Sequence, residues 1–313
     1  MRGWALADVG TGWRPDGAQD AGLAELAGER RHLMNLGYRM LGTVADAEEA
    51  VQETYVRWYR LTPEDRDAVD SPRAWLTRVA GRICLDMLGS ARARRERYVG
   101  EWLPEPLPGS PFAPSRPEHA DPADTVTLDE TVSTALLVVL ESLTPAERVA
   151  FVLREVFAMP YADIAQVVGR SPEACRQLAS AARRHVREGR SREATRERHD
   201  VIVRAFADAC RGGSLSALAS VLDPDVVLKS DGGGIVSAAR RPVIGVSNVS
   251  RFLLGIVAKN PGLGVEERET GDGIALAFRR DGRTTGVMNL NVVGDAVKDV
   301  WIVLNPGKLG LWN

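Results

Sequence analysis

The stretch from 160 to 187, PYADIAQVVGRSPEACRQLASAARRHVR, constrains the fold most, because it predicts two short helices joined by a tight turn. The first helix would have an apolar side formed by Ile164, Ala165 and Val168. Gly169 follows directly and is a residue that can adopt the backbone of a turn. The pattern therefore predicts a helix-turn-helix.

The second helix of this pair is expected to start after Ser171, an N-cap residue, with Pro172 at the first helical position. Residues spaced by four would face inward: Ala174, Leu178, Ala182 and Val186. The other side would carry Arg176, Gln177, Ser180, Arg183, Arg184 and Arg187. Such side chains can reach base edges and phosphates, which favours DNA binding over the alternative of a helical hairpin with a solvated basic face.

The composition is that of a globular protein with several domains. The chain has 313 residues, 44% hydrophobic and 26% charged, with a net charge of −2. No overall basic field indicates nucleic acid, so any DNA contact must come from a local patch. Lysine is absent before Lys229, and this change in composition predicts a domain boundary near residue 200.

The few scattered cysteines indicate a protein of the reducing cell interior, and the N-terminus agrees with this location. Cys84, Cys175 and Cys210 have no metal-ligand spacing, so we expect no metal, cofactor or disulfide, and Cys175 as a small buried residue. Residues 1–24 would be a flexible tail without the layout of a signal peptide, and no apolar run could span a bilayer. We expect a cytoplasmic protein with no membrane contact.

A first helical domain is predicted over residues 25–99. A helical pattern from Leu23 to Arg60 is broken near Gly42. Two apolar stripes are expected: Leu33, Leu36, Met40 and Leu41 before the break, and Ala47, Val51, Tyr55, Trp58 and Tyr59 after it. Opposite the second stripe lies an acidic face of Asp46, Glu48, Glu49, Gln52 and Glu53. It is either a solvated surface or a docking surface for a basic partner helix.

A third helix is expected to begin at Ser71-Pro72 and to end in a second basic cluster. Its apolar positions are Trp75, Leu76, Val79, Ile83, Leu85 and Leu88, and the cluster contains Arg92, Arg94, Arg95 and Arg97. Residues 100–126 carry seven prolines between Pro104 and Pro122, which predicts an extended, semi-rigid linker. Trp102 and Leu103 are apolar for a spacer, which indicates that the WLPEP segment docks on another surface.

A second helical domain is predicted over residues 127–196. A helix is expected from about Leu128 to Leu143, and the TPAE sequence at 144–147 predicts a capping box that starts the next helix, which would end near Phe157. The helix-turn-helix follows. Residues 197–313 differ: the pattern predicts helices at 199–210, 214–222 and 246–259 and strands at 226–229, 264–269, 273–280, 284–293 and 297–304. This order predicts an α+β cone with a pocket between sheet and helices.

Residues 25–190 resemble an extracytoplasmic-function (ECF) sigma factor. The resemblance is carried by the acidic-faced helix, the Trp-bearing helix that ends in arginines, the linker, the TPAER opening and the YADIA…S-x-E helix-turn-helix. It implies a cytoplasmic promoter-specificity subunit with two all-α domains, sigma regions 2 and 4. Its partners would be promoter DNA and core RNA polymerase, through the clamp helices of the β′ subunit and the β flap.

The resemblance also assigns expected site residues. Core polymerase would be bound by Asp46, Glu49, Gln52 and Glu53. The −10 element would be contacted by Trp75, Arg78, Arg82, Arg92, Arg94 and Arg95. The −35 element would be read by Arg170, Ser171, Glu173, Arg176, Gln177, Ser180, Arg183, Arg184 and Arg187.

The last domain resembles the SnoaL-like branch of the NTF2-like superfamily. Three motifs, WLPEP at 102–106, DGGG at 231–234 and NPGKL at 305–309, resemble an ECF subgroup with a fused SnoaL-like extension. The resemblance implies regulatory contacts from Trp102, Leu103, Pro104, Glu105, Pro106, Asp231, Gly232, Gly233, Gly234, Asn305, Pro306, Lys308 and Leu309. Ile235 and Gly307 depart from the subgroup, which usually has a lysine and an aspartate there. The extension would pack on the sigma domains or the linker and modulate activity; the sequence leaves open whether its pocket binds a ligand.

Two other functions are weighed against the sigma factor. One is a conventional helix-turn-helix regulator with a metabolite-sensing C-terminal domain, which would have no need of residues 33–97. The other is an enzyme of the ketosteroid-isomerase or polyketide-cyclase type with a DNA-binding preface, in which Asp231 would be a general base. Because His199 is the only histidine in the last domain, a turn-forming Asp231 is favoured and no catalytic residue is expected.

Overall fold

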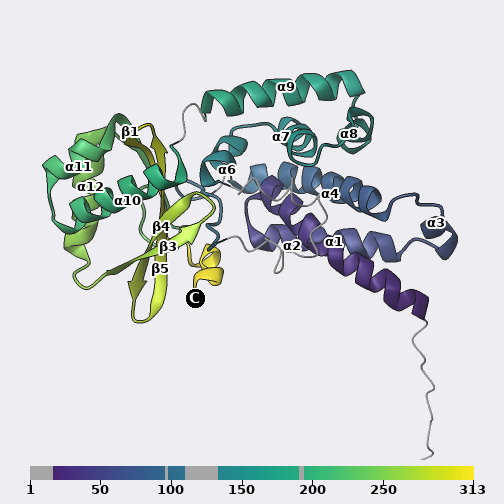
Figure 1. Ribbon diagram of the computed structural model, residues 1–313, viewed down its shortest axis with the longest axis horizontal. Helices are drawn as coiled ribbons and strands as arrows, with labels where there is room; N and C mark the ends of the chain where they lie inside the picture. The colour runs from purple at the N-terminus through teal and green to yellow at the C-terminus, as the bar shows by residue number, and fades with distance from the viewer. Residues whose placement is uncertain (1–16, 96–97, 110–132, 190–193) are drawn as a thin grey trace, which may run out of the picture.

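The computed structural model describes residues 17–95, 98–109, 133–189 and 194–313. It has a helical N-terminal half and a C-terminal half in which helices cover a curved sheet (Figure 1). The sheet lies between its own helices and the helical half. The predicted fold class is confirmed in its architecture: two all-α units are followed by an α+β unit.

The first helical unit contains α1 (Gly17–Leu41), α2 (Val44–Tyr59), α3 (Pro63–Asp67) and α4 (Pro72–Arg95). Helix α1 starts at Gly17, so residues 17–24 are helical rather than part of a tail. The predicted break occurs at Gly42, whose φ of +80° favours glycine. The predicted stripes are buried, except that Tyr55 is half-buried and Tyr59 is 50% exposed. The stripe continues through Ala50 and Thr54, because a spacing of three and four follows the helix better than the spacing that ends at Tyr59.

The second helical unit contains α6 (Thr134–Glu141), α7 (Pro145–Phe151), the π-helix η2 (Val152–Val156), α8 (Tyr161–Val168) and α9 (Pro172–Gly189). The predicted capping box is present: Thr144 accepts from the Glu147 amide, and the Glu147 carboxylate accepts from the Thr144 amide. The helix-turn-helix is confirmed, with Gly169 left-handed at a φ of +72° and the hydroxyl of Ser171 accepting from the Ala174 amide.

The two helical units share one hydrophobic core. Buried residues from α1, α2 and α4 form a single cluster with buried residues from α6 to α9. Helix α4 packs on both α7 and α8, and Gly81 lies where a Cβ would be 3.3 Å from the Val167 side chain. The helix that the resemblance assigns to the −10 element is therefore packed directly on the helix-turn-helix.

The C-terminal unit begins with α10 (Arg196–Arg211) and α11 (Leu215–Val221). Its sheet contains β1 (Leu222–Asp231), β2 (Val243–Ile244), β3 (Gly264–Thr270), β4 (Gly273–Arg280), β5 (Arg283–Val293) and β6 (Ala296–Val303). Helix α12 (Val246–Lys259) precedes β3, and two 3₁₀ turns, η3 (Pro306–Lys308) and η4 (Gly310–Trp312), end the chain. The strand order is β2-β1-β6-β5-β4-β3, with only the β1–β6 pair parallel.

Both faces of the sheet are covered along most of β4 and the second half of β6, which explains why 273–278 and 300–303 are continuous apolar runs. In β6, Val300 and Ile302 point into the core under α10, α11 and α12. Trp301 and Val303 point to the opposite face, where they pack with Leu103 of the linker and Ala135 of α6. The linker and α6 therefore complete the second face of the sheet.

Candidate functional site

The acidic face predicted on α2 is present and its apolar side packs on α1 and α4. Glu49 and Gln52 are exposed, and neither side chain forms a hydrogen bond or ion pair within the described residues. Glu53 pairs with Arg57 one turn later at 2.9 Å, and Asp46 accepts from the hydroxyl of Thr43 at 2.7 Å. The face is a negatively charged surface that a cationic helix could contact.

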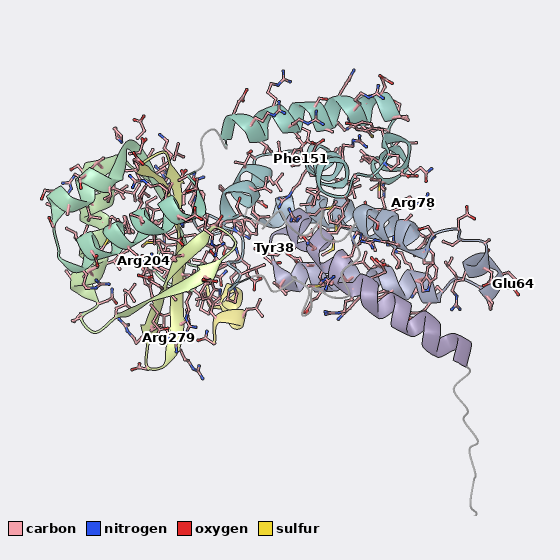
Figure 2. The ribbon with its side chains drawn as sticks, viewed as in Figure 1. Tyr38, Glu64, Arg78, Phe151, Arg204 and Arg279 are labelled. Carbon is pink, nitrogen blue, oxygen red and sulfur yellow. The ribbon has the colours of Figure 1, made fainter. Side chains whose placement is uncertain are left out.

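The arginines predicted on α4 contact the helix-turn-helix. Arg78 lies where α4 faces α8 and is 3.5 Å from the carboxylate of Asp163 (Figure 2). Arg82 donates to the backbone carbonyl of Val167 at 3.1 Å. Trp75 packs edge-to-face on Trp58 with 5.1 Å between ring centroids, so its ring is part of the core. The side chains of Arg92, Arg94 and Arg95 lie outside the described residues.

Helix α9 exposes the polar face that the sequence predicts. Of the nine predicted −35 residues, all are exposed except Arg183, which is half-buried. Arg183 donates to the Glu155 carboxylate at 3.2 Å, which raises the pKa of its guanidinium. Arg176 pairs with Glu173 at 3.0 Å.

The buried stripe of α9 differs from the prediction. It consists of Cys175, Ala179, Ala182 and Val186, while Ala174 and Leu178 are only half-buried. A strict spacing of four drifts around a helix with 3.6 residues per turn, whereas the observed spacings of four, three and four stay on one face. Cys175 is fully buried, as expected for a small packing residue.

Asp231, at the end of β1, is fully buried and accepts hydrogen bonds from both halves of the molecule. Its carboxylate accepts from the Tyr98 hydroxyl at 2.5 Å and from the Leu103 amide at 3.0 Å. It also forms an ion pair with Lys308 at 2.7 Å. Burial, followed by the hydrogen bond to Asp231, raises the pKa of Tyr98, so that this hydroxyl remains a donor. The carboxylate is therefore saturated with donors rather than available as a base.

Lys308 connects the C-terminal turn to the linker. Its ammonium donates to the Leu103 carbonyl at 2.5 Å and lies 4.0 Å from the centroid of the Trp102 ring. The Asn305 amide donates to the Tyr98 hydroxyl at 2.9 Å. The structure thus brings together residues of all three predicted motifs. We call Tyr98, Leu103, Asp231, Asn305 and Lys308 the linker clamp.

The glycines of the DGGG motif allow the loop after β1 to turn tightly at this point. A Cβ at Gly232 would lie 2.1 Å from the Val236 carbonyl oxygen, and one at Gly233 would lie 2.6 Å from the Asn305 side chain. Gly234 has a φ of +72° and approaches Val99. Leu309 is buried beside Leu103, whereas Pro306, Ile235 and Gly307 are exposed.

The rest of the WLPEP segment packs on the first helical unit. The Glu105 amide donates to the Gly42 carbonyl at 2.8 Å, and its carboxylate accepts from the Val44 amide at 2.8 Å. Tyr38, which lies on the side of the helical half that faces the C-terminal domain, donates to the Glu105 carbonyl at 2.6 Å (Figure 2). Burial raises the pKa of Glu105 against the lowering effect of the Val44 amide. Pro104 and Pro106 are also buried, so the segment lies between the two halves.

Three interdomain hydrogen bonds are missing from the sequence prediction. Asp272, between β3 and β4, accepts from the Thr134 amide at the start of α6 at 2.8 Å. Asn289 of β5 donates to the Thr134 hydroxyl at 3.1 Å. The Trp312 indole donates to the Pro106 carbonyl at 2.8 Å. No local pattern marks these residues, because each is defined only by its partner in another domain.

Comparison with known proteins identifies the helical half. The family model for Sigma-70 region 2 matches residues 27–94, and that for Sigma-70, region 4 matches residues 133–186. Two matched sigma regions on one chain define the class of promoter-specificity proteins. They do not favour the conventional regulator, which has no need of the first region.

Relatives that match beyond these two regions extend the comparison. The chain is 43% identical over 245 residues to the ECF RNA polymerase sigma factor SigJ of Mycobacterium tuberculosis, covering 77% of this chain and 75% of the relative. It is 36% identical over 282 residues to a probable ECF RNA polymerase sigma factor, SigI, of the same species, covering 90% and 92%. The crystal structure of M. tuberculosis SigJ superposes with a TM-score of 0.72 and 34% identity, covering 92% of this chain and 98% of that one.

The chain belongs to the ECF RNA polymerase sigma factors. Proteins of this family bind core RNA polymerase and promoter DNA, and their activity is one of binding. Among the described residues there is no cluster of side chains that could hold a metal ion. No helix within the same residues is long and apolar enough to cross a bilayer.

Proposed function

We propose that three surfaces of the helical half recruit core polymerase to a promoter. The acidic face of α2 docks on the clamp helices of the β′ subunit, and region 4 also contacts the β flap. The polymerase-binding residues are Asp46, Glu49, Gln52 and Glu53. The exposure of Glu49 and Gln52 without partners among the described residues supports this role, because nothing must be broken before they bind.

The exposed face of α9 reads the −35 element in the major groove, and α4 engages the −10 element. At the first site, Arg170, Arg176, Gln177, Arg184 and Arg187 are exposed and can reach phosphates or base edges. At the second, Arg78 and Arg82 act with Arg92, Arg94 and Arg95. Trp75 supports α4 through its contact with Trp58.

The C-terminal domain holds region 2 and region 4 packed against each other. We call this arrangement closed, and in it the chain cannot engage both promoter elements. Positions −10 and −35 are about 25 base pairs apart, or about 85 Å at about 3.4 Å per base pair. In the closed arrangement α4 packs on α8, which packs on α9, and each such step spans about 8–10 Å. The observation that carries this proposal is that Arg78 and Arg82 bind Asp163 and Val167 of the helix-turn-helix, so region 4 occupies a surface needed for DNA.

The linker clamp transmits this restraint from the C-terminal domain to both sigma regions. Through Asp231 and Lys308 it holds Leu103, and through Glu105 the same short segment is fixed on the corner between α1 and α2. The contact between Asp272 and Thr134 fixes the start of region 4 on the same sheet. Fusion keeps these weak surfaces at high effective concentration, so they can hold the closed state without a separate inhibitor.

Run-off transcription with core polymerase tests this proposal. Replacing Asp231 and Lys308 together by alanine should raise transcription severalfold above that of the wild-type chain, because the closed arrangement is loosened. The matched control replaces Asp223 and Lys298, an ion pair of 3.0 Å on the surface of the same domain, and should change nothing. Equal transcription by the clamp variant and the control would contradict the regulatory role.

A further inference from the structure

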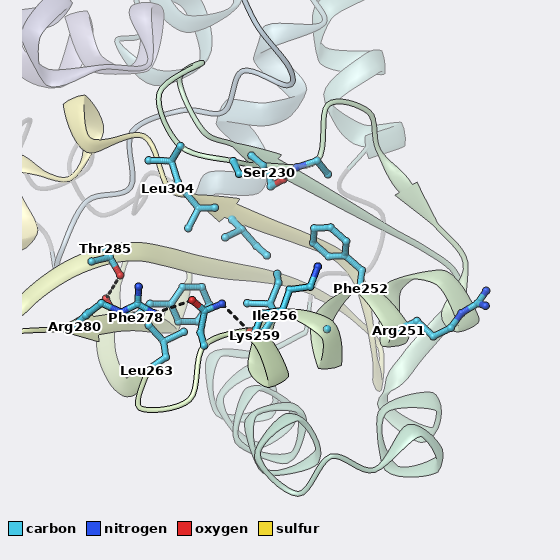
Figure 3. Close-up of a pocket in the computed structure, with 17 residues that line it drawn as sticks. Ser230, Arg251, Phe252, Ile256, Lys259, Leu263, Phe278, Arg280, Thr285 and Leu304 are labelled. Atoms are coloured by element: carbon cyan, nitrogen blue, oxygen red, sulfur yellow. Dashed lines mark hydrogen bonds between the residues drawn. The ribbon is translucent and has the colours of Figure 1, made fainter.

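A cavity of about 620 Å³ lies in the C-terminal domain between the sheet, α12 and the loop that follows β1 (Figure 3). This volume is within the range of about 300–1,000 Å³ typical of small-molecule sites. Its walls are mainly apolar and include Phe252, Ile256, Leu263, Phe278, Ile302 and Leu304. An apolar ligand body would therefore be removed from water here.

The charged groups around the cavity are all cationic. Arg251, Lys259 and Arg280 line it, and no carboxylate is among the lining residues that the structure describes. The guanidinium of Arg251 is directed away from the cavity and donates to Asn248 at 2.9 Å (Figure 3). Arg280 donates to Asn260 at 2.7 Å. The ammonium of Lys259 has no partner among the described residues, so it is the cation available to an anionic ligand.

Gly255 gives an independent indication that the cavity is kept open. It is in the middle of α12 and lines the cavity, and a Cβ built there would meet nothing within 4 Å. Glycine is among the poorest helix formers, and its backbone here does not have a positive φ. Neither close packing nor backbone conformation therefore requires glycine, whereas any larger side chain would project into the cavity.

We propose that this cavity binds a small amphipathic carboxylate, with its apolar body along the Phe252 and Phe278 walls and its carboxylate paired with Lys259. Asn260, adjacent to Lys259, can donate a second hydrogen bond through its amide. An alcohol of the same chain length would lose the ion pair, and a cation would be repelled by Lys259 and Arg280.

The cavity is also connected to the linker clamp, and this part of the inference rests on the proposed function. Val236 and Ala239 form one wall, while Gly234 lies against Val99 and Ala239 lies against Gly100, at the start of the linker. The Leu304 amide donates to the Asp231 carbonyl at 2.7 Å, and the Leu304 side chain lines the cavity. Because Leu304 and the loop after β1 belong to both the cavity wall and the clamp contacts, opening the clamp would deform the cavity. A ligand that fits the cavity of the closed chain therefore stabilises the closed arrangement and lowers transcription.

Isothermal titration of the full chain tests the site with decanoate and decanol as probes. Decanoate should bind the wild type, and decanol should bind about tenfold more weakly. Lys259→Met should lower the affinity for decanoate about tenfold, and Gly255→Leu should abolish decanoate binding. The matched control Arg251→Met, which removes a cation directed away from the cavity, should bind as the wild type does. No decanoate binding, equal affinity for decanol, or unchanged binding by Gly255→Leu would overturn the site.

Folding and coupling are measured separately. Gly255→Leu should melt at or above the temperature of the wild type by circular dichroism, because leucine is a better helix former than glycine. Decanoate should lower run-off transcription by the wild type severalfold and leave Gly255→Leu unaffected. Binding without any change in transcription would overturn the coupling alone. If neither the wild type nor Gly255→Leu supports transcription, the proposed function fails. The calorimetry still tests separately whether the cavity binds decanoate.

Discussion

Asp231 and Lys308 form an ion pair of 2.7 Å that is almost fully removed from solvent, with side chains 0% and 7% exposed. The pair belongs to the C-terminal domain, yet each partner also binds Leu103 of the linker. A buried charge is stabilised only while its ion-pair and hydrogen-bond partners stay in contact with it. The pair therefore makes the packing of the C-terminal domain conditional on the linker being seated.

This geometry predicts a large loss of stability when one partner is removed. Lys308→Met leaves a buried carboxylate with three neutral donors, and we expect a loss of about 3–5 kcal/mol in the free energy of unfolding in urea. Adding Asp231→Asn to the same chain should cost less than the sum of the two single losses. Lys298→Met, at a partly exposed pair, should cost at most about 1 kcal/mol. Additive single losses would show that the pair is not coupled.

Adding a single methyl group at Gly42 should destabilise the folded chain. It has a φ of +80°, and a Cβ there would lie 2.7 Å from the Trp102 ring. Gly42→Ala should lower the free energy of unfolding by about 1–3 kcal/mol, because it combines backbone strain with displacement of the linker. Gly89→Ala is the matched control, since its Cβ meets nothing within 4 Å and it lies inside α4. The control should be neutral or stabilising by up to about 1 kcal/mol. Equal changes in the free energy of unfolding for the two variants would contradict the close approach of Gly42 to the Trp102 ring.

The acidic face of α2 should be needed for polymerase binding. Glu49→Arg with Glu53→Arg should weaken the complex with core polymerase, measured by co-migration on size exclusion at low salt. The matched control reverses the same number of charges at Glu266 and Glu267, both exposed on β3 in the C-terminal domain. The control should co-migrate like the wild type. If the variant with both α2 charges reversed still forms the complex, the assignment of α2 as the polymerase-docking surface is wrong.

Glu105 should add a pH dependence with a defined sign. Its pKa in the folded chain is raised from 4.5 mainly by burial, so the folded state binds its proton more readily than the unfolded state. The resulting contribution to stability grows as pH falls from above the raised pKa to 4.5. Relative to Glu105→Gln, the wild type should therefore gain in free energy of unfolding on acidification through this window. A difference between the two chains that does not vary with pH would contradict the shift.

The sequence predicts elements well where one local pattern defines them. Helix α12 and strand β4 have the bounds expected, and the capping box at Thr144 is present. Strand β2 is missed because Val243–Ile244 is too short for a period to be visible. The partners of Asp272 and Tyr98 could not be predicted, since they lie 138 and 133 residues away in sequence and depend on how the domains pack.

The central claim is that the chain rests in a closed arrangement that must open to engage a promoter. Arg78→Cys with Asp163→Cys places thiols where the two side chains now approach within 3.5 Å across α4 and α8. The control pair, Arg204→Cys with Glu267→Cys, replaces an exposed ion pair of 3.0 Å inside the C-terminal domain. Both pairs are crosslinked with a short reducible reagent before core polymerase is added.

Run-off transcription from these crosslinked chains tests the account most directly. The Arg78–Asp163 crosslink should abolish transcription, and reduction should restore it, while the control pair should be active in both states. Full transcription by the chain crosslinked between α4 and α8 would contradict the account, because the two sigma regions would then function without separating.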